Sequence, residues 1–136
     1  MLARVFTLVL LTPSAALATS YSFRTQPTGR LGGPVRFEFR GESSARAKRD
    51  VTSFTVSKRT PDHTWKPVWS ISSKALGTIA IQYGSTPLNW NTVTPPQRLV
   101  AGHIYAAFAS DGHGGLSSIY FRFDHQGKMT FPDSPD

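Results

Sequence analysis

The chain has 136 residues, a formal net charge of +7 and no cysteine. This length suits one domain with a single hydrophobic core, and the missing cysteines exclude both disulfide bonds and a cysteine nucleophile. Stability must therefore come from packing, for which nine Phe, four Tyr and three Trp supply large apolar surfaces.

Residues 1–18 have the three regions of a secretory signal peptide. Arg4 is the basic residue of the first region, residues 5–11 are mostly apolar, and the small side chains of Ala16 and Ala18 suit a signal peptidase. The apolar run is shorter than the ~20 residues of a membrane-spanning helix, so we expect cleavage after Ala18 instead of a membrane anchor. The sequence thus predicts an exported protein, periplasmic or secreted, with no transmembrane segment in its mature chain. Export without disulfides favours a bacterial envelope.

The next segments have the patterns of β-strands. Residues 35–40 alternate apolar and charged side chains, which predicts a half-buried strand. Residues 53–57 and 65–71 flank a turn that contains Pro61, so they predict a hairpin. Pro67 cannot donate to a β-ladder, and the second strand of this hairpin is expected to begin after Pro67 or to lie at a sheet edge.

Further strands are expected in the C-terminal half. Residues 78–83 alternate again, whereas the prolines in residues 85–98 predict a long loop. Residues 103–109 are apolar on both faces, as in a central strand. Residues 119–124 and 128–131 flank a Gly-containing turn and predict a hairpin.

These segments together predict the fold class. No segment after residue 20 shows a sustained helical period. About seven to eight short strands with regular turns predict an all-β fold, either a single antiparallel β-sandwich of two sheets or a small barrel, with the sandwich preferred. The domain is expected to cover residues 19–131, and residues 132–136 are expected to be a disordered tail.

One local pattern favours the sandwich. Residues 99–105 resemble the tyrosine-corner segment of fibronectin type III and related immunoglobulin-like domains. In those domains a Tyr at the start of the sixth strand hydrogen-bonds to backbone upstream. The resemblance implies a structural role for Tyr105. The chain departs from the family in lacking a clear Trp on its second strand.

Residues suited to catalysis or metal binding do not converge in this sequence. Asp111 with His113, and Asp124 with His125, could ligate a metal ion. The extended strand between the two pairs, at ~3.3 Å per residue, should hold them at opposite ends of the domain. We therefore expect neither a metal site nor a cofactor. No serine lies in a nucleophile elbow and no glycine-rich loop precedes a helix, so an enzyme is not expected. A hydrolase or metal-binding protein with an unmarked site stays an alternative.

Loops are the candidate binding regions, because they vary without disturbing a core. The segments 41–50, 85–98 and 110–115 are basic, proline-stiffened and glycine-rich, respectively. Their candidate binding residues are Arg46, Lys48, Arg49, Trp90, Asp111 and His113. In the alternative interpretation the basic residues form a solvated loop, and Trp90 folds back over one end of the core.

The functional prediction follows from export, charge and loops. We expect a non-enzymatic binding or adaptor domain that contacts an anionic or protein partner, either another envelope or secreted protein or an acidic glycan or glycolipid. A structural subunit that assembles through an edge strand is the alternative. Nucleic acid is not an expected partner, because the chain is predicted to be exported and carries no recognised nucleic-acid module.

Overall fold

The computed structural model describes residues 23–41, 51–74 and 77–136. Within these ranges the chain forms strands and no helix, so the predicted all-β class is confirmed there. No helix that could span a membrane was found in the described part of the chain. The expected signal peptide, residues 1–18, lies outside the described residues.

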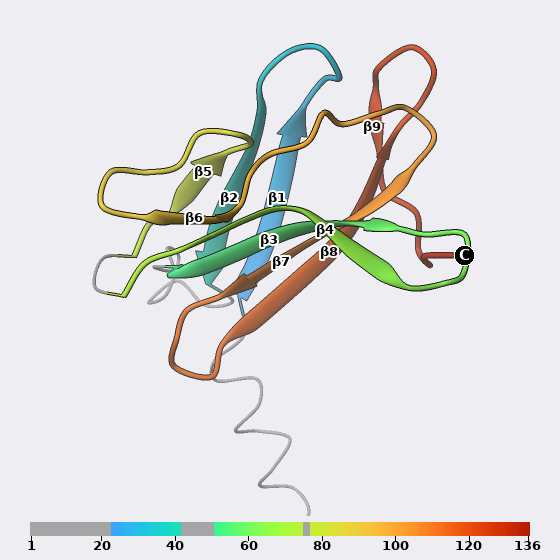
Figure 1. The fold of residues 1–136 in the computed structure, drawn as a ribbon. Helices are drawn as coiled ribbons and strands as arrows, with labels where there is room; N and C mark the ends of the chain where they lie inside the picture. Colours follow the sequence, from blue (N-terminus) through green and yellow to red (C-terminus); the bar gives the residue numbers. More distant parts are fainter. Residues whose placement is uncertain (1–22, 42–50, 75–76) are drawn as a thin grey trace, which may run out of the picture.

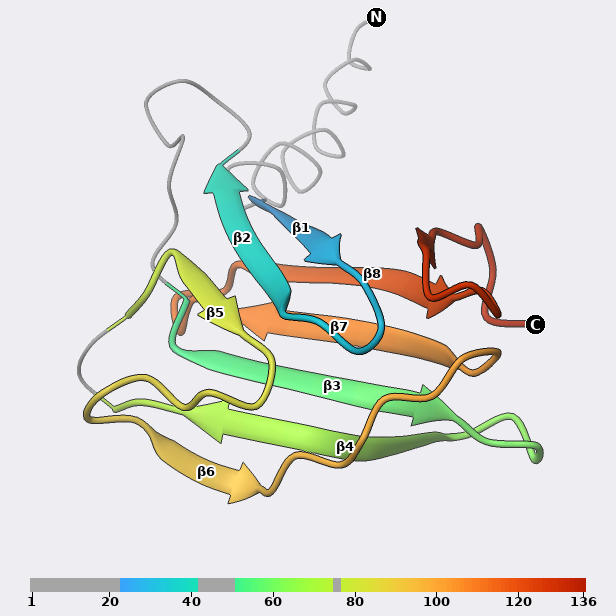
Figure 2. The ribbon, with the colours of Figure 1, turned by 90° about the horizontal axis from the view of Figure 1, so that it is seen from above.

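The described strands form two antiparallel sheets, as predicted. The smaller sheet has the strand order β1-β2-β5, and the larger sheet has the order β6-β4-β3-β7-β8-β9. The smaller sheet lies across one face of the larger one (Figures 1 and 2). The strands are β1 (Phe23–Gly29), β2 (Val35–Gly41), β3 (Ser53–Arg59), β4 (Trp65–Ser72), β5 (Ala80–Gln82), β6 (Asn91–Thr94), β7 (Ile104–Ser110), β8 (Leu116–Phe123) and β9 (Met129–Thr130).

The core lies between the two sheets and is largely aromatic. Phe37 of β2 is fully buried, and its ring centroid lies 4.8 Å from that of Phe54 on β3 and 5.7 Å from that of Phe121 on β8. Phe39 contacts Phe54 as well, at 5.6 Å. The alternation of β2 therefore places its apolar side chains against the larger sheet, as predicted.

The hairpin of β3 and β4 is confirmed, but β4 does not begin after Pro67. It begins at Trp65, and Pro67 stands opposite Ser57 beside a register shift in the ladder. Such an irregularity accommodates a residue that has no N–H to donate. On its other side, β4 pairs with β6 only at residues 70–72, so Pro67 lies beyond the β6 ladder.

The expected loop at residues 85–98 contains a strand that the prolines concealed. Strand β6 pairs with the second half of β4, and its Thr-Val-Thr run has the β-branched side chains that favour extended backbone. Strand β5 is shorter than the alternation of residues 78–83 predicts. Ile79 is 39% exposed and lies outside the core, whereas Ile81 is buried.

Strand β7 is a central strand, as predicted, because it lies between β3 and β8. The hairpin of β8 and β9 is also present. The C-terminal residues 132–136, which the sequence analysis assigned to a tail beyond the domain, return toward the turn between β3 and β4. There the Asp136 carboxylate accepts hydrogen bonds from Arg59.

Candidate ligand-binding surface

The tyrosine-corner hydrogen bond implied by the sequence is present. The backbone N–H of Val100 donates to Tyr105 Oη at 2.8 Å, and the Tyr105 side chain is buried. Burial raises the pKa of Tyr105, which keeps the hydroxyl protonated. The Tyr105 ring stacks on Phe121, with centroids 5.5 Å apart. Tyr105 therefore joins the segment before β7 to the core.

Trp90, a predicted binding residue, is not exposed as an anchor. Its residue is 8% exposed and belongs to the hydrophobic core, as the alternative interpretation had it. Asn89, with a left-handed φ of 67°, lies in the tight turn that precedes Trp90. The exposed apolar residues of this segment are Leu88 and Val93 instead. Burial of the large apolar surface of the indole is more favourable in free energy than its exposure to water.

Asp111 shapes its own turn instead of presenting a carboxylate to solvent. It is 2% exposed, and Oδ1 accepts the backbone N–H of His113 at 2.8 Å and of Gly115 at 2.9 Å. His113 is exposed beside it. The turn between β7 and β8 therefore encloses the carboxylate of Asp111, which the sequence analysis named as a candidate binding residue.

The other acidic and histidine residues considered as metal ligands are not brought together in the structure. Asp124 lies at the opposite end of β8 from Asp111, where Oδ1 accepts the backbone N–H of Lys128 and Gln126, and these bonds lower the pKa of Asp124. No group of three or more His, Asp or Glu that could hold a metal ion occurs in the described ranges. The candidate binding residues Arg46, Lys48 and Arg49 lie outside those ranges.

The outer face of the larger sheet, turned away from the smaller sheet, carries an unexpected set of side chains. Along β7 it exposes 43% of Phe108, and along β8 it exposes 57% of Leu116. The apolar residues on both faces of β7 thus line the core on one side and this outer face on the other. From the strand register, the outward residues of β3, β7 and β8 are Ser53, Thr55, Ser57, Arg59, Ile104, Ala106, Phe108, Ser110, Leu116, Ser118, Tyr120 and Arg122.

Two aromatic rings meet across this face. Trp65 and Tyr120 are nearly parallel, at 8°, with centroids 5.7 Å apart. They come from β4 and β8, which β3 and β7 separate, so their backbones are about 14 Å apart at ~4.8 Å per strand. Both side chains must therefore lie along the sheet. The small side chains of Ser57 and Ala106, which are paired in the ladder, leave room for them.

The rings border a shallow hollow of about 270 Å³. Besides the two rings, it is lined by Phe108, Ala106 and two serines, Ser57 and Ser118. We call Trp65, Phe108 and Tyr120 the aromatic platform. Trp65 and Tyr120 are half-buried, so each keeps part of its ring in contact with water.

A pair of basic side chains lies beside the platform. The Arg59 guanidinium carbon lies 5.1 Å from the Trp65 ring centroid, a cation–π contact. Arg59 also donates to both oxygens of Asp136, each at 3.0 Å, and His63 Nδ1 lies 3.0 Å from Asp136 Oδ1. These bonds, from His63 and then Arg59, lower the pKa of Asp136. We call Arg59 and His63 the carboxylate clamp.

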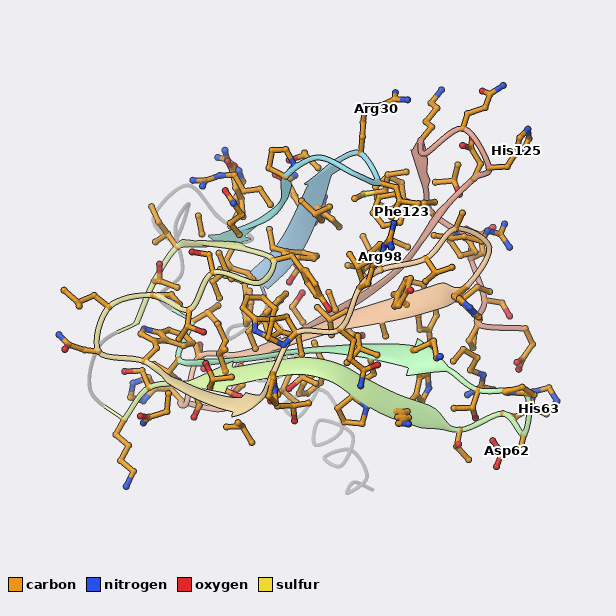
Figure 3. All side chains as sticks on the ribbon, turned by 45° about the horizontal axis from the view of Figure 1, so that its top comes forward. Arg30, Asp62, His63, Arg98, Phe123 and His125 are labelled. Carbon is orange, nitrogen blue, oxygen red and sulfur yellow. The ribbon has the colours of Figure 1, made fainter. Side chains whose placement is uncertain are left out.

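The turn between β3 and β4 positions His63. Figure 3 shows Asp62 and His63 at the tip of this turn. The Asp62 carboxylate accepts hydrogen bonds from the hydroxyls of Thr60 and Thr64, which lower its pKa. His63 adopts a left-handed φ of 64°. The acidic residue of the turn is thus bound within the turn, while the imidazole reaches Asp136.

A second hollow lies on another side of the molecule. A cleft of about 1030 Å³ is lined by residues 31–35, 82–83 and 98–101. Tyr83 Oη donates to the Gln97 carbonyl at 2.7 Å, and burial raises the pKa of Tyr83 to about 12. Its lining is mainly apolar, with Arg98 as the charged residue, far from His63 in Figure 3. This cleft suits an apolar ligand with one negative charge.

Compared with protein-family models, curated proteins and solved structures, the chain has no match. Function must therefore be argued from the surfaces themselves. Sequence reasoning missed the platform and the clamp. The available signal was the apolar character of residues 103–109 on both faces, which marks an exposed binding face when only one side of the sheet is covered.

Proposed function

We propose that this chain is an exported, non-enzymatic binding domain whose ligand is a glycan held on the aromatic platform. The observation that carries the proposal is the pair of Trp65 and Tyr120 rings, which stack on one another across the outer face of the larger sheet. The hydrophobic C–H face of a pyranose ring packs on such a ring, while its hydroxyl groups hydrogen-bond to polar neighbours.

The polar neighbours favour a glycan over a protein partner. Serine and threonine side chains line the outer face around the platform, and Thr55 already shares a hydrogen bond of 2.9 Å with Ser70. Serine is depleted at protein–protein interfaces, whereas hydroxyl groups match the donors and acceptors of a sugar.

We further propose that the domain is immunoglobulin-like, of the fibronectin type III kind. In constant-type immunoglobulin domains the first, second, fourth and fifth strands form one sheet, and the third, sixth and seventh strands form the other. Here β1, β2 and β5 form the smaller sheet and β3, β7 and β8 are consecutive in the larger one, but β4 joins the larger sheet beside β3. The Tyr105 hydrogen bond at the start of β7 supports the same assignment. Strands β6 and β9 are additions to it.

Binding to a panel of oligosaccharides tests the proposed function. The intrinsic fluorescence of the full chain provides a readout, because Trp69 and Trp90 are buried and Trp65 is the half-exposed indole. We expect a saturable fluorescence change that Tyr120→Ala, which keeps the Trp65 indole, abolishes and Leu88→Ala, a control at an 88% exposed residue, preserves. If the panel produces no change, the proposal is overturned.

Sedimentation of the same variants distinguishes a protein interface. Concentration-dependent self-association that Tyr120→Ala removes would assign the platform to a second copy of the chain and overturn glycan binding. A monomer whose sugar binding depends on Tyr120 supports the proposal.

A further inference from the structure

We propose that the carboxylate clamp is the acidic subsite of the platform, so that the glycan is a polyuronate, and that Asp136 occupies this subsite as an internal stand-in. The inference rests on the proposed function, because it names the ligand class of the same surface. It adds that the ligand is negatively charged, that Arg59 and His63 recognise this charge, and that Asp136 competes with the ligand for them.

The contacts of Arg59 show that the clamp is built to receive a carboxylate. A guanidinium offers a planar fork that matches two carboxylate oxygens, and Arg59 uses it on both oxygens of Asp136. Arg59 also lies against the Trp65 ring, and its side chain is only 16% exposed. The guanidinium is therefore held in position by the ring, beside the place where a sugar would stack.

This arrangement fits a uronic acid. In a hexuronate the carboxylate is bonded directly to the pyranose ring, so a sugar stacked on Trp65 carries its negative charge close to its apolar face. Asp136 holds a carboxylate next to Trp65 through Arg59 and His63. Its side-chain carboxylate marks where the uronate group would bind.

The backbone of His63 provides an independent observation. An L-residue in the left-handed region has an unfavourable backbone conformation, which glycine adopts without steric strain. His63 nevertheless has a φ of 64° and directs Nδ1 to the Asp136 carboxylate. Strain of this kind gathers at binding sites, where the side chain has to be held in one place.

The charge of the outer face agrees with an acidic ligand. Its outward residues on β3, β7 and β8 include Arg59 and Arg122 and no Asp or Glu. The acidic groups near the clamp are Asp136 and Asp62, and Asp62 is bound by two threonine hydroxyls. A polyanion would therefore meet a basic face in which one carboxylate, that of Asp136, has to leave.

Asp136 is a replaceable occupant. Its side chain is 52% exposed, and ion pairs of exposed side chains contribute little to stability. A polyuronate presents many carboxylates on one chain and adds stacking on Trp65, so it can displace a single tethered carboxylate. Removing the carboxylate of Asp136 should therefore increase affinity for the ligand.

Binding of an oligogalacturonate and of its methyl ester to the full chain tests the inference. The two probes share the same sugar rings and differ only in charge. We expect the acid to bind at least tenfold more tightly at low salt and Arg59→Lys to lose most of that preference. Asp136→Asn should raise affinity for the acid severalfold and leave that for the ester unchanged. Arg98→Lys, on the separate cleft, is the matched control and should change neither.

The outcomes separate the two proposals. Equal affinities for acid and ester, both lost in Trp65→Ala, would overturn the acidic subsite and leave the glycan proposal standing. No binding of either sugar would overturn both. Poly-glutamate that binds as tightly as the oligogalacturonate would assign the clamp to an acidic peptide and also overturn the inference. His63→Gly provides a second variant, because glycine suits the turn while removing the imidazole.

Discussion

Replacing Tyr105 by Phe should measure how much the tyrosine-corner hydrogen bond stabilises this fold. The ring of Tyr105 is buried and stacks on Phe121, and Phe keeps that packing. The substitution removes only the hydroxyl, which accepts the Val100 N–H at 2.8 Å. A net hydrogen bond contributes about 0.5–1.5 kcal/mol, and leaving the half-buried N–H unsatisfied adds a fraction of its desolvation cost. We expect a loss of about 1–2 kcal/mol.

Denaturant unfolding of both proteins measures this loss, and thermal unfolding should show a midpoint lower by roughly 5–10 °C. Tyr120→Phe is the matched control, since it removes the hydroxyl of a half-exposed tyrosine for which the structure records no hydrogen bond. It should change stability by less than ~0.5 kcal/mol. Equal losses in the two variants would refute the role of the corner.

Three further predictions concern the core, the clamp turn and alkaline stability. Trp90→Ala should cost about 3–5 kcal/mol because it empties part of the core, whereas Leu88→Ala should cost less than ~0.5 kcal/mol; similar unfolding midpoints would mean that Trp90 is not buried. His63→Gly should be more stable than His63→Ala by about 1 kcal/mol, because only glycine suits the left-handed backbone; denaturant curves that coincide would contradict this conformation. Burial raises the pKa of Tyr83 from its ordinary value of 10.0 to about 12, so the buried phenol stabilises the fold fully below pH ~10, and this stabilisation is lost as the pH rises toward 12. Tyr83→Phe should flatten the decline of the unfolding free energy over that range, and an unchanged slope would show that the phenol is not buried.

Local patterns were sufficient for much of the fold. The alternation of residues 35–40 places Val35, Phe37 and Phe39 in the core because a strand turns successive side chains to opposite faces. The turn at residues 111–115 and the hydrogen bond of Tyr105 likewise depend on neighbours within a few residues. Interactions of this range are encoded where they occur in the chain.

Patterns were insufficient where two interpretations shared the same residues. Trp90 fits both an exposed anchor and a lid on the core, and the outcome depends on how β6 pairs with β4. The apolar residues of β7 fit both a strand covered on two sides and one with an open face. Which interpretation holds depends on whether another part of the chain covers the residue, and local periodicity carries no information about that.

The sequence by itself determined strands β2, β3, β7 and β8, much of the core and the tyrosine corner, because each follows from short-range periodicity or turn chemistry, whereas it indicated neither β1 nor β6. Only the tertiary structure decided the candidate binding surface. Trp65 and Tyr120 meet because the register of four strands places small residues between them, and Asp136 reaches Arg59 across 77 positions of the chain. Contacts between such distant positions depend on how the strands pair, which no segment specifies alone.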